Sequence, residues 1–305
     1  MRALITGGSG FVGPYLKSEL ESRLYSVAVL DHKCDLTQPD QVESHITPFL
    51  ANGSGDSVTV FHLAALSHVG MSWQSPSRYV EVNIGGTVNL LKMLSDAKFQ
   101  GKFVFVSSAE VYGKSDTPRP ISESTQANPL SPYAASKLAA ESFVMQYSRA
   151  YDFHAVVARP FNHIGPNQLD KFLVPAIAKR IVTAQRANVD TIDVGNLDAV
   201  RDFLDVRDVV GAYVDLAERS NPGEIYNVCS GKGTIVRKLV ETMIEISGYP
   251  LRLQVNPDLV RPIEVEYLVG DNTKIAESIN FVPKFDLAAT LSDVLKFWRD
   301  QLELV

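Results

Sequence analysis

The sequence predicts an α/β fold: a doubly wound parallel sheet of the Rossmann type with a smaller, discontinuous C-terminal substrate lobe. Three observations support this prediction. In the first half of the chain, short β-rich runs alternate with longer helical patterns. These short runs are almost continuously apolar, as expected for parallel strands that are covered on both faces. Finally, Gly7, Gly10 and Gly13 directly follow the first run, where doubly wound folds bind phosphate groups.

The first half of the chain contains the expected elements of this sheet. Right-handed crossovers between successive strands would give the doubly wound arrangement. The expected strands are residues 2–6, 26–30, 58–63, 102–107 and 155–159. The expected helices are residues 11–23, 38–50, 76–97 and 132–151. Residues 115–132 are rich in proline, serine and threonine and are predicted to form a loop.

The pattern changes after residue 162. A helix at 205–219 and a strand at 224–228 resemble further elements of the main sheet. The other expected elements are helices 172–187, 234–247 and 286–302 and strands 191–194 and 251–255. We therefore predict a dinucleotide-binding domain of residues 1–161 plus about 203–229, and a substrate-binding lobe of about 162–202 and 230–305.

The composition is that of a globular protein without a membrane-spanning segment. The 305 residues suffice for one large domain or two interlocked ones. Hydrophobic residues make up 45% and charged residues 21% of the chain, and no apolar stretch approaches the ~18 residues of a membrane helix. The net charge is −6 and there is no lysine/arginine block, which argues against nucleic acid as a partner.

Two cysteines, Cys34 and Cys229, are too few for a disulfide framework and lack the spacing of metal ligands. No metal site is therefore expected. The N-terminal apolar run stops at Thr6 and the glycines, so it is interpreted as a strand and not as a signal peptide. We accordingly expect a cytoplasmic protein in a reducing compartment.

The glycine motif predicts a dinucleotide site. Its position between a strand and a helix is the context that gives such a motif meaning. The glycines permit a tight turn and a close approach of the backbone to a pyrophosphate, and the helix N-terminus presents N–H groups to the phosphates. Phe11 and Val12 lie inside the motif and are expected to contact the cofactor as well.

The second strand ends at an acidic residue, Asp31, which is expected to accept hydrogen bonds from the adenosine ribose. This carboxylate would repel a 2′-phosphate and so favour NADH. His32 and Lys33 follow at once and can offset the repulsion, so the choice between NADH and NADPH stays open. Asp35 and Leu36 can flank the adenine, although Asp35 can equally cap the helix that starts near residue 39.

A tyrosine and a lysine, Tyr133 and Lys137, predict a proton-transfer site. They lie one helical turn apart and therefore share a helix face. The chain has eleven tyrosines, and only Tyr133 has a lysine four residues later. The ammonium is expected to lower the pKa of the phenol from about 10, so that Tyr133 acts as acid or base near neutrality.

Two serines, Ser107 and Ser108, follow the fourth strand at the edge of the sheet where ligands bind in such folds. A hydroxyl at this position can hydrogen-bond the substrate oxygen as charge develops on it. We assign this role to Ser108, with Ser107 as the alternative.

Taken together, these motifs resemble the extended short-chain dehydrogenase/reductases that act on nucleotide sugars. The resemblance covers essentially the whole chain and implies that Ser108, Tyr133 and Lys137 are catalytic. It rests on the glycine turn, His62-Leu63-Ala64-Ala65, Asn83, Ser108 with Val111-Tyr112-Gly113, the Tyr133/Lys137 pair and Arg159-Pro160. It further implies that NADPH or NADH contacts Leu63, Ala64, Ala65, Asn83, Ser107, Tyr133, Lys137 and Pro160.

Four segments of the C-terminal half are similar to the branch of this family that acts on GDP-sugars. They are residues 158–166, 194–203, 226–231 and 261–265. An arginine fork suits phosphate, and a carboxylate suits a ribose diol or a guanine N–H edge. The resemblance implies contacts to the nucleotide diphosphate or its sugars by Asn162, Arg201, Arg261 and Glu264.

Arg201 can instead form a surface ion pair with Asp202 or Asp205. Arg180 is a candidate for contact with the base or a phosphate, although a basic pair on a helix is usually solvated. Glu110 is expected to contact hydroxyls of the sugar.

The resemblance implies NAD(P)H-dependent reduction of the C4 keto group of GDP-4-keto-6-deoxy-D-mannose to GDP-6-deoxy-D-mannose (GDP-D-rhamnose). It leaves the stereochemistry at C4, rhamnose or talose, open. It also implies a homodimer formed through helices near 76–97 and 132–151.

The main alternative is a GDP-mannose 4,6-dehydratase or another nucleotide-sugar epimerase or dehydratase, because dehydratases use a glutamate base at the position of Glu110. Against it stand Ala109, where dTDP-glucose-type dehydratases have an aspartic acid, the missing arginine-rich loop after the second strand, and the different sequence of residues 164–168. A remote alternative is an inactive nucleotide-binding protein of this fold, which would usually have lost the tyrosine or the lysine.

Overall fold

A six-stranded parallel sheet forms the centre of the computed structural model, which describes residues 1–30, 33–51, 58–114, 117–259 and 265–303. The strand order is β2-β1-β3-β4-β5-β9. The strands are β1 (Arg2–Thr6), β2 (Ser26–Leu30), β3 (Val58–His62), β4 (Lys102–Val106), β5 (His154–Pro160) and β9 (Glu224–Val228). The order reverses between β1 and β3, and in such sheets ligands bind beyond the carboxyl ends of these two strands.

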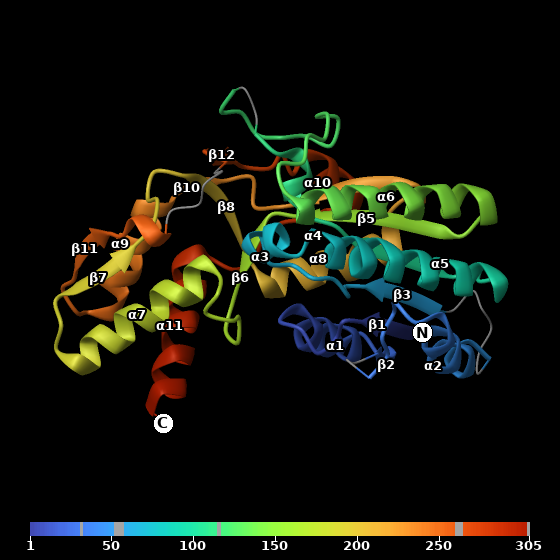
Figure 1. Ribbon diagram of the computed structural model, residues 1–305, viewed down its shortest axis with the longest axis horizontal. Coiled ribbons are helices and arrows are strands. Elements are labelled where there is room, and N and C mark those ends of the chain that lie inside the picture. Colours follow the sequence, from blue (N-terminus) through green and yellow to red (C-terminus); the bar gives the residue numbers. More distant parts are fainter. Residues whose placement is uncertain (31–32, 52–57, 115–116, 260–264, 304–305) are drawn as a thin grey trace.

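Helices cover both faces of this sheet (Figure 1). They are α1 (Val12–Ser22), α2 (Pro39–Ala51), α5 (Gly86–Asp96), α6 (Pro132–Tyr151) and α8 (Val206–Arg219). Alternate side chains of a strand point to opposite faces. Ala3 and Ile5 of β1 therefore pack in the core with α1 and α8, whereas Leu4 packs in the core with α2, α5 and α6. These two cores confirm the predicted doubly wound α/β fold.

A smaller lobe is built around β8 (Val200–Asp205) and lies at one end of the main sheet (Figure 1). β8 pairs with β6 (Asn162–Ile164), β10 (Gly233–Ile235) and β12 (Tyr267–Leu268). A second short parallel pair joins β7 (Thr191–Val194) to β11 (Arg252–Val255). The lobe's own apolar core is closed by α7 (Leu173–Ala187), α9 (Val236–Ser247) and α11 (Leu287–Glu303).

Several short elements are not predicted by the sequence, although the long ones end within about two residues of their expected bounds. β6, β10 and β12 have only two or three residues each. β8 has six residues, but Arg201, Asp202 and Asp205 interrupt any apolar run. These strands form because neighbouring strands pair with them. Two short helices, α3 (Val69–Gln74) and α10 (Thr273–Ile279), are also additional.

The single helix expected at 76–97 is wrong in detail. The segment divides into α4 (Pro76–Tyr79), a π-helical turn, η2 (Val80–Gly85), and α5. Inside η2, the Asn83 side chain accepts a hydrogen bond from the Leu66 backbone N (2.8 Å) and donates one to the Leu66 carbonyl (3.1 Å). These contacts tie the wide turn to the segment after β3. Such π-helical turns occur frequently at functional sites.

Three buried carboxylates, Asp202, Asp205 and Asp208, attach the C-terminal part of the chain to β8 and α8. Asp202 accepts hydrogen bonds from the backbone of residues 230, 231 and 270. Asp205 accepts one from the Thr290 hydroxyl (2.7 Å), and Asp208 accepts bonds from the backbone of residues 284 and 285. The lobe is thus fixed to the sheet by hydrogen bonds as well as by apolar packing. Among the residues described, no helix has the length and apolar character to cross a membrane.

Candidate functional site

The glycine turn between β1 and α1 combines two structural glycines with one that faces open space. A Cβ on Gly13 would lie 2.0 Å from the Gly8 carbonyl oxygen, and one on Gly7, whose φ is +69°, would lie 2.6 Å from the backbone of Ala64. A Cβ on Gly10 would meet only the Gly7 carbonyl oxygen, at 3.3 Å. Gly7 and Gly13 therefore close the turn against its neighbours, whereas Gly10 keeps one side of the backbone accessible.

The N-terminus of α1 suits an anion. The helix begins at Val12, its N-cap residue Phe11 makes no side-chain capping bond, and its first turn contains no acidic residue. Backbone N–H groups at this end therefore have no side-chain partner from the cap, and they point toward the position where doubly wound folds hold a pyrophosphate. Together with the open side at Gly10, this fits the predicted dinucleotide cofactor.

We expect Gly10→Ala and Gly13→Ala to separate binding from folding. Gly13→Ala should lower the free energy of unfolding by about 3 kcal/mol or more, because its Cβ overlaps a backbone atom. Gly10→Ala should leave the unfolding transition nearly unchanged but weaken NADPH binding by about tenfold, since it narrows the approach to the phosphates. Thermal unfolding and a fluorescence titration with NADPH measure the two effects. A Gly10→Ala protein with normal NADPH affinity would contradict this assignment.

The segment after β3 is held beside the glycine turn by buried hydrogen bonds. His62 bonds to Thr6 (2.6 Å) and to Thr87 (2.9 Å), and Thr6 Oγ1 also accepts a bond from the Ala64 backbone N (3.3 Å). Burial, together with the positive charge of Lys137, lowers the pKa of His62 to about 3, so it is neutral. The predicted cofactor residues Leu63, Ala64 and Ala65 thus follow a strand end that is fixed to β1.

The structure places Asn83 in a supporting role. Besides its two bonds to Leu66, its Nδ2 donates to the hydroxyl of Ser136 (2.9 Å). Ser136 lies on α6 between Tyr133 and Lys137, so Asn83 joins the loop after β3 to the helix that carries the proton-transfer pair. Contact between Asn83 and the cofactor stays a prediction.

Tyr133, Lys137 and Ser108 meet at the carboxyl edge of the sheet. α6 begins after Ser131, whose hydroxyl accepts a hydrogen bond from the Ala134 backbone N (3.1 Å). Tyr133 is 8% exposed and hydrogen-bonds the Ser108 side chain. Lys137 is 3% exposed, and its Nζ lies 4.5 Å from the centre of the Phe105 ring on β4. A phenol, a hydroxyl and an amine from two distant segments are therefore brought together.

The expected lowering of the Tyr133 pKa is wrong for this site. Burial raises the pKa to about 12, and the charge of Glu110 adds to the rise, while the bond to Ser108 opposes it. Burial also lowers the pKa of Lys137 to about 7, partly opposed by Glu141. The lysine therefore carries only part of a charge at neutrality. A phenol that keeps its proton is suited to act as an acid, which is the role that a reduction requires.

The two serines after β4 differ in their contacts. The Ser108 hydroxyl accepts a hydrogen bond from the Glu110 backbone N (3.2 Å) in addition to its bond with Tyr133. The Ser107 hydroxyl is buried and has no hydrogen-bond partner among the described residues. Because buried hydroxyls are normally paired, this oxygen fits a ligand contact. The geometry therefore favours Ser108 beside the substrate oxygen and Ser107 beside the cofactor.

Two further cofactor candidates are engaged within the protein. The Asp35 carboxylate accepts hydrogen bonds from the backbone N (2.9 Å) and the hydroxyl (2.8 Å) of Thr37, so it stabilises the turn that leads into α2. Leu36 is buried, and its carbonyl accepts a bond from Asn89 (2.9 Å). Their contact with adenine stays a prediction. Asp31 and His32 lie outside the described residues.

The candidate substrate residues come from different parts of the lobe. Asn162 begins β6, which pairs with β8 so that Asn162 lies opposite Phe203, two residues from Arg201. Pro160 ends the adjoining strand β5. Arg180 is half-buried on α7 and donates to the Asp193 carbonyl of β7 (2.9 Å). Arg261 and Glu264 lie outside the described residues.

Asp202 and Asp205 are the two proposed ion-pair partners of Arg201. Asp202 accepts its hydrogen bonds from the backbone and from the Ser230 hydroxyl (2.6 Å). Asp205 pairs with Arg207 (2.7 Å). Both carboxylates therefore have other partners, and Arg201 Nη1 donates to the Val200 carbonyl (2.9 Å).

Sequence reasoning missed the buried pair of Glu141 and Arg159. Both side chains are at most 5% exposed, and Arg159 donates to both carboxylate oxygens, at 3.0 and 2.6 Å. The one indication in the sequence that Glu141 belongs to the site was its position, one helical turn beyond Lys137. In the part of the chain that is described, no cluster of three or more His, Cys, Asp or Glu side chains is arranged to hold a metal ion.

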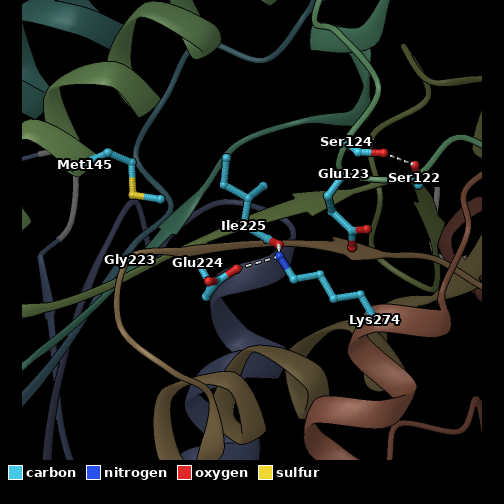
Figure 2. Close-up of a pocket in the computed structure, with 8 residues that line it drawn as sticks. All are labelled: Ser122, Glu123, Ser124, Met145, Gly223, Glu224, Ile225 and Lys274. Carbon is cyan, nitrogen blue, oxygen red and sulfur yellow. Dashed lines mark hydrogen bonds and ion pairs between the residues drawn. The ribbon is translucent and has the colours of Figure 1, made fainter.

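A cavity of about 440 Å³ lies along the outer edge of β9 (Figure 2). Polar side chains that line it form hydrogen bonds with backbone groups of β9, the strand at the edge of the sheet. Glu123 accepts a hydrogen bond from the Asn227 backbone N (2.7 Å), and Lys274 donates to the Ile225 carbonyl (2.8 Å) and pairs with Glu224 (2.6 Å). Charged side chains that cover an edge strand prevent pairing with other chains. We therefore infer that the charged side chains lining this cavity protect the edge strand from pairing with other chains. The cavity is separate from the Tyr133 site.

Known proteins are similar to this chain over most of its length. A family model described as GDP-mannose 4,6 dehydratase matches residues 32–294. The chain is 34% identical over 305 residues to GDP-6-deoxy-D-mannose reductase of Pseudomonas aeruginosa. The aligned region covers 99% of this chain and 98% of that protein. The chain is 35% identical over 280 residues to GDP-6-deoxy-D-talose 4-dehydrogenase of Aggregatibacter actinomycetemcomitans, covering 90% of each.

This chain is also similar to a solved protein structure. The structure of RMD from Pseudomonas aeruginosa complexed with NADPH matches this chain with a TM-score of 0.90 at 34% identity. The match covers 98% of this chain and 99% of that one. The likeness therefore includes the main sheet and the smaller lobe.

Proposed function

Because this chain belongs to the GDP-mannose 4,6-dehydratase family of extended short-chain dehydrogenase/reductases, we propose that it is an NAD(P)H-dependent reductase of GDP-4-keto-6-deoxy-D-mannose. The product is GDP-6-deoxy-D-mannose, also called GDP-D-rhamnose. The observation that carries this proposal is the meeting of Tyr133, Ser108 and Lys137 at the carboxyl end of β4. The similarity to the reductase of Pseudomonas aeruginosa over nearly the whole chain supports the choice of substrate.

The site residues divide the work of a carbonyl reduction. When bound, the reduced nicotinamide supplies a hydride to C4 of the sugar. Tyr133, which keeps its proton at neutral pH because its pKa is about 12, donates that proton to the carbonyl oxygen. Ser108 hydrogen-bonds the same oxygen as it becomes negative. Lys137 stabilises the phenolate that remains and binds the nicotinamide ribose.

Substrate binding falls to the smaller lobe in this proposal. Asn162 and Arg201, on neighbouring strands, contact the diphosphate, and Arg180, Arg261 and Glu264 contribute to recognition of the GDP moiety. Binding energy from this moiety positions the reacting carbonyl. Glu110, whose charge acts on Tyr133, contacts the sugar hydroxyls. Residues 1–161 with about 203–229 thereby bind the cofactor, and residues 162–202 and 230–305 bind the sugar nucleotide.

We further propose a homodimer in the cytoplasm. The faces of α5 and α6 that are turned away from the sheet would form the contact between the two copies. Phe143 and Tyr151 on α6 and Val80 on the adjoining η2 are large apolar side chains that are 40% or more exposed, which supports this choice of surface. Both cysteines are buried and neither forms a disulfide, in keeping with a reducing compartment.

Incubation with NADPH and GDP-4-keto-6-deoxy-D-mannose tests the activity. We expect NADPH absorbance to fall by one equivalent per equivalent of sugar, because a reductase consumes its cofactor. A dehydratase or epimerase regenerates the cofactor, so turnover of GDP-mannose without added reductant would overturn the proposal. NMR of the product distinguishes the D-rhamnose from the D-talose configuration, and a parallel assay with NADH gives the cofactor preference.

A further inference from the structure

The groups near Lys137 in the described part of the chain come from three elements, and Glu141 is the charged one among them. From β3, His62 faces it as a neutral imidazole. From β4, it is covered by the Phe105 ring. On its own helix α6, Tyr133 lies one turn before it and Glu141 one turn after it. Glu141 is thus the acidic group that acts on the buried amine, and it favours the protonated form.

The Glu141 carboxylate is itself held in place by Arg159, which lies on β5. Arg159 donates from Nε to one oxygen (3.0 Å) and from Nη2 to the other (2.6 Å). Paired, two-point contacts of this kind fix both the position and the orientation of a carboxylate. Both side chains are at most 5% exposed, so water does not screen the pair from Lys137.

Arg159 is fixed in turn by a buried polar network. Its guanidinium lies 4.8 Å from the centre of the Tyr112 ring. The Tyr112 hydroxyl donates to Asn227 Oδ1 (2.7 Å), and Asn227 is bonded to Glu123, which lines the cavity in Figure 2. The network therefore runs from the outer edge of β9 to the proton-transfer helix.

We propose that Glu141 is a positioning residue of the reaction, whose carboxylate, fixed by Arg159, increases the fraction of Lys137 that is protonated beside Tyr133. This role rests on the proposed function, because it matters when Tyr133 has given its O–H proton to the carbonyl oxygen and is left as a phenolate. Without the carboxylate, the buried lysine loses its proton more readily, and the phenolate loses its neighbouring positive charge.

The experiment measures the titration of Lys137 directly. NMR of the lysine Cε and Nζ signals in labelled protein gives its pKa without any substrate, and the signal is identified by its loss in Lys137→Met. We expect Glu141→Gln to lower the pKa of Lys137 by about one unit or more. Turnover of NADPH with the 4-keto sugar should then fall by about tenfold at pH 8 and much less at pH 6, because acid restores the charge.

A double variant provides a second test in case Glu141→Gln does not fold, since that substitution leaves Arg159 buried without its partner. In Glu141→Gln with Arg159→Met both charges are absent, and the pKa of Lys137 should lie between those of the wild type and of Glu141→Gln. Asp215→Asn is the matched control, because it removes the carboxylate on α8 that Arg23, the residue after α1, binds at 2.6 Å. It should leave the pKa of Lys137 unchanged.

Two results would overturn the proposal. One is an unchanged Lys137 pKa in the folded variants that lack the Glu141 carboxylate. The other is a loss of turnover that is equal at pH 6 and pH 8, which would indicate a purely structural role. Failure of the proposed function is seen separately, as a wild-type protein that does not oxidise NADPH with the 4-keto sugar.

Discussion

Replacement of Tyr133 by phenylalanine is expected to lower turnover by about 100-fold or more while the binding of NADPH and GDP persists. The ring of Tyr133 packs against Tyr79 with centroids 6.3 Å apart, and phenylalanine keeps this contact. What is removed is the hydroxyl that Ser108 bonds and that we assign as the proton donor. Steady-state oxidation of NADPH with the 4-keto sugar measures the effect, and titration with GDP measures binding.

The control for this variant is Tyr79→Phe. Tyr79 is also buried, and its hydroxyl donates to the carbonyl of His68 (2.6 Å), so the variant likewise removes one buried phenol hydroxyl. We expect it to change turnover far less than Tyr133→Phe. Near-normal turnover of Tyr133→Phe would refute the assignment of the acid.

Replacement of Lys137 by methionine is expected to have two effects of opposite sign. Turnover should fall by about 100-fold or more, because the phenolate form of Tyr133 loses its stabilising cation. The free energy of unfolding should rise, by about 2 kcal/mol or more at pH 6, because the wild-type protein must bury a charged amine. Denaturant unfolding at several pH values measures the second effect.

The pH dependence of that gain follows from the pKa of Lys137, which is about 7 in the folded protein and 10.5 as the ordinary value. Below pH 7 the lysine is charged in both states, so the full burial penalty is present and the variant has its largest advantage. As the pH rises from 7 toward 10.5, the folded protein has released a proton that the unfolded chain still holds. The wild type therefore gains stability and the difference shrinks.

Lys92→Met provides the matched control. Lys92 lies on the neighbouring helix α5, has a side chain that is 61% exposed and pairs with Asp96. Its removal should neither stabilise the protein at pH 6 nor lower turnover. If Lys137→Met were less stable than the wild type at pH 6, the penalty that we assign to the buried amine would be absent.

The local parts of the site could be predicted because they depend on neighbouring residues. Gly7, Gly10 and Gly13 stand between an apolar strand and a helix, and the structure gives each a distinct spatial reason. Tyr133 and Lys137 share a face because they lie one turn apart on the same helix. In each case the number of residues between the members of the motif determines how they are arranged in three dimensions.

Other features depend on partners that are distant in the sequence. β8 contains three charged residues and has no apolar periodicity, and it becomes a strand because β6, β10 and β12 pair with it. Asp202 is buried by backbone groups that lie 28 to 68 residues further along the chain. Nothing near Asp202 in the sequence indicates these partners.

The sequence by itself determined the doubly wound fold, the glycine turn and the placing of Tyr133 and Lys137 on one helix face, because each follows from short-range periodicity or spacing. Only the tertiary structure decided the protonation of that pair. Burial raises the pKa of Tyr133 although a lysine stands nearby, since the loss of water around a charge outweighs a partner that is itself only partly protonated. Burial is a property of the assembled fold, and so is the pairing of Glu141 with Arg159 across 18 residues of chain.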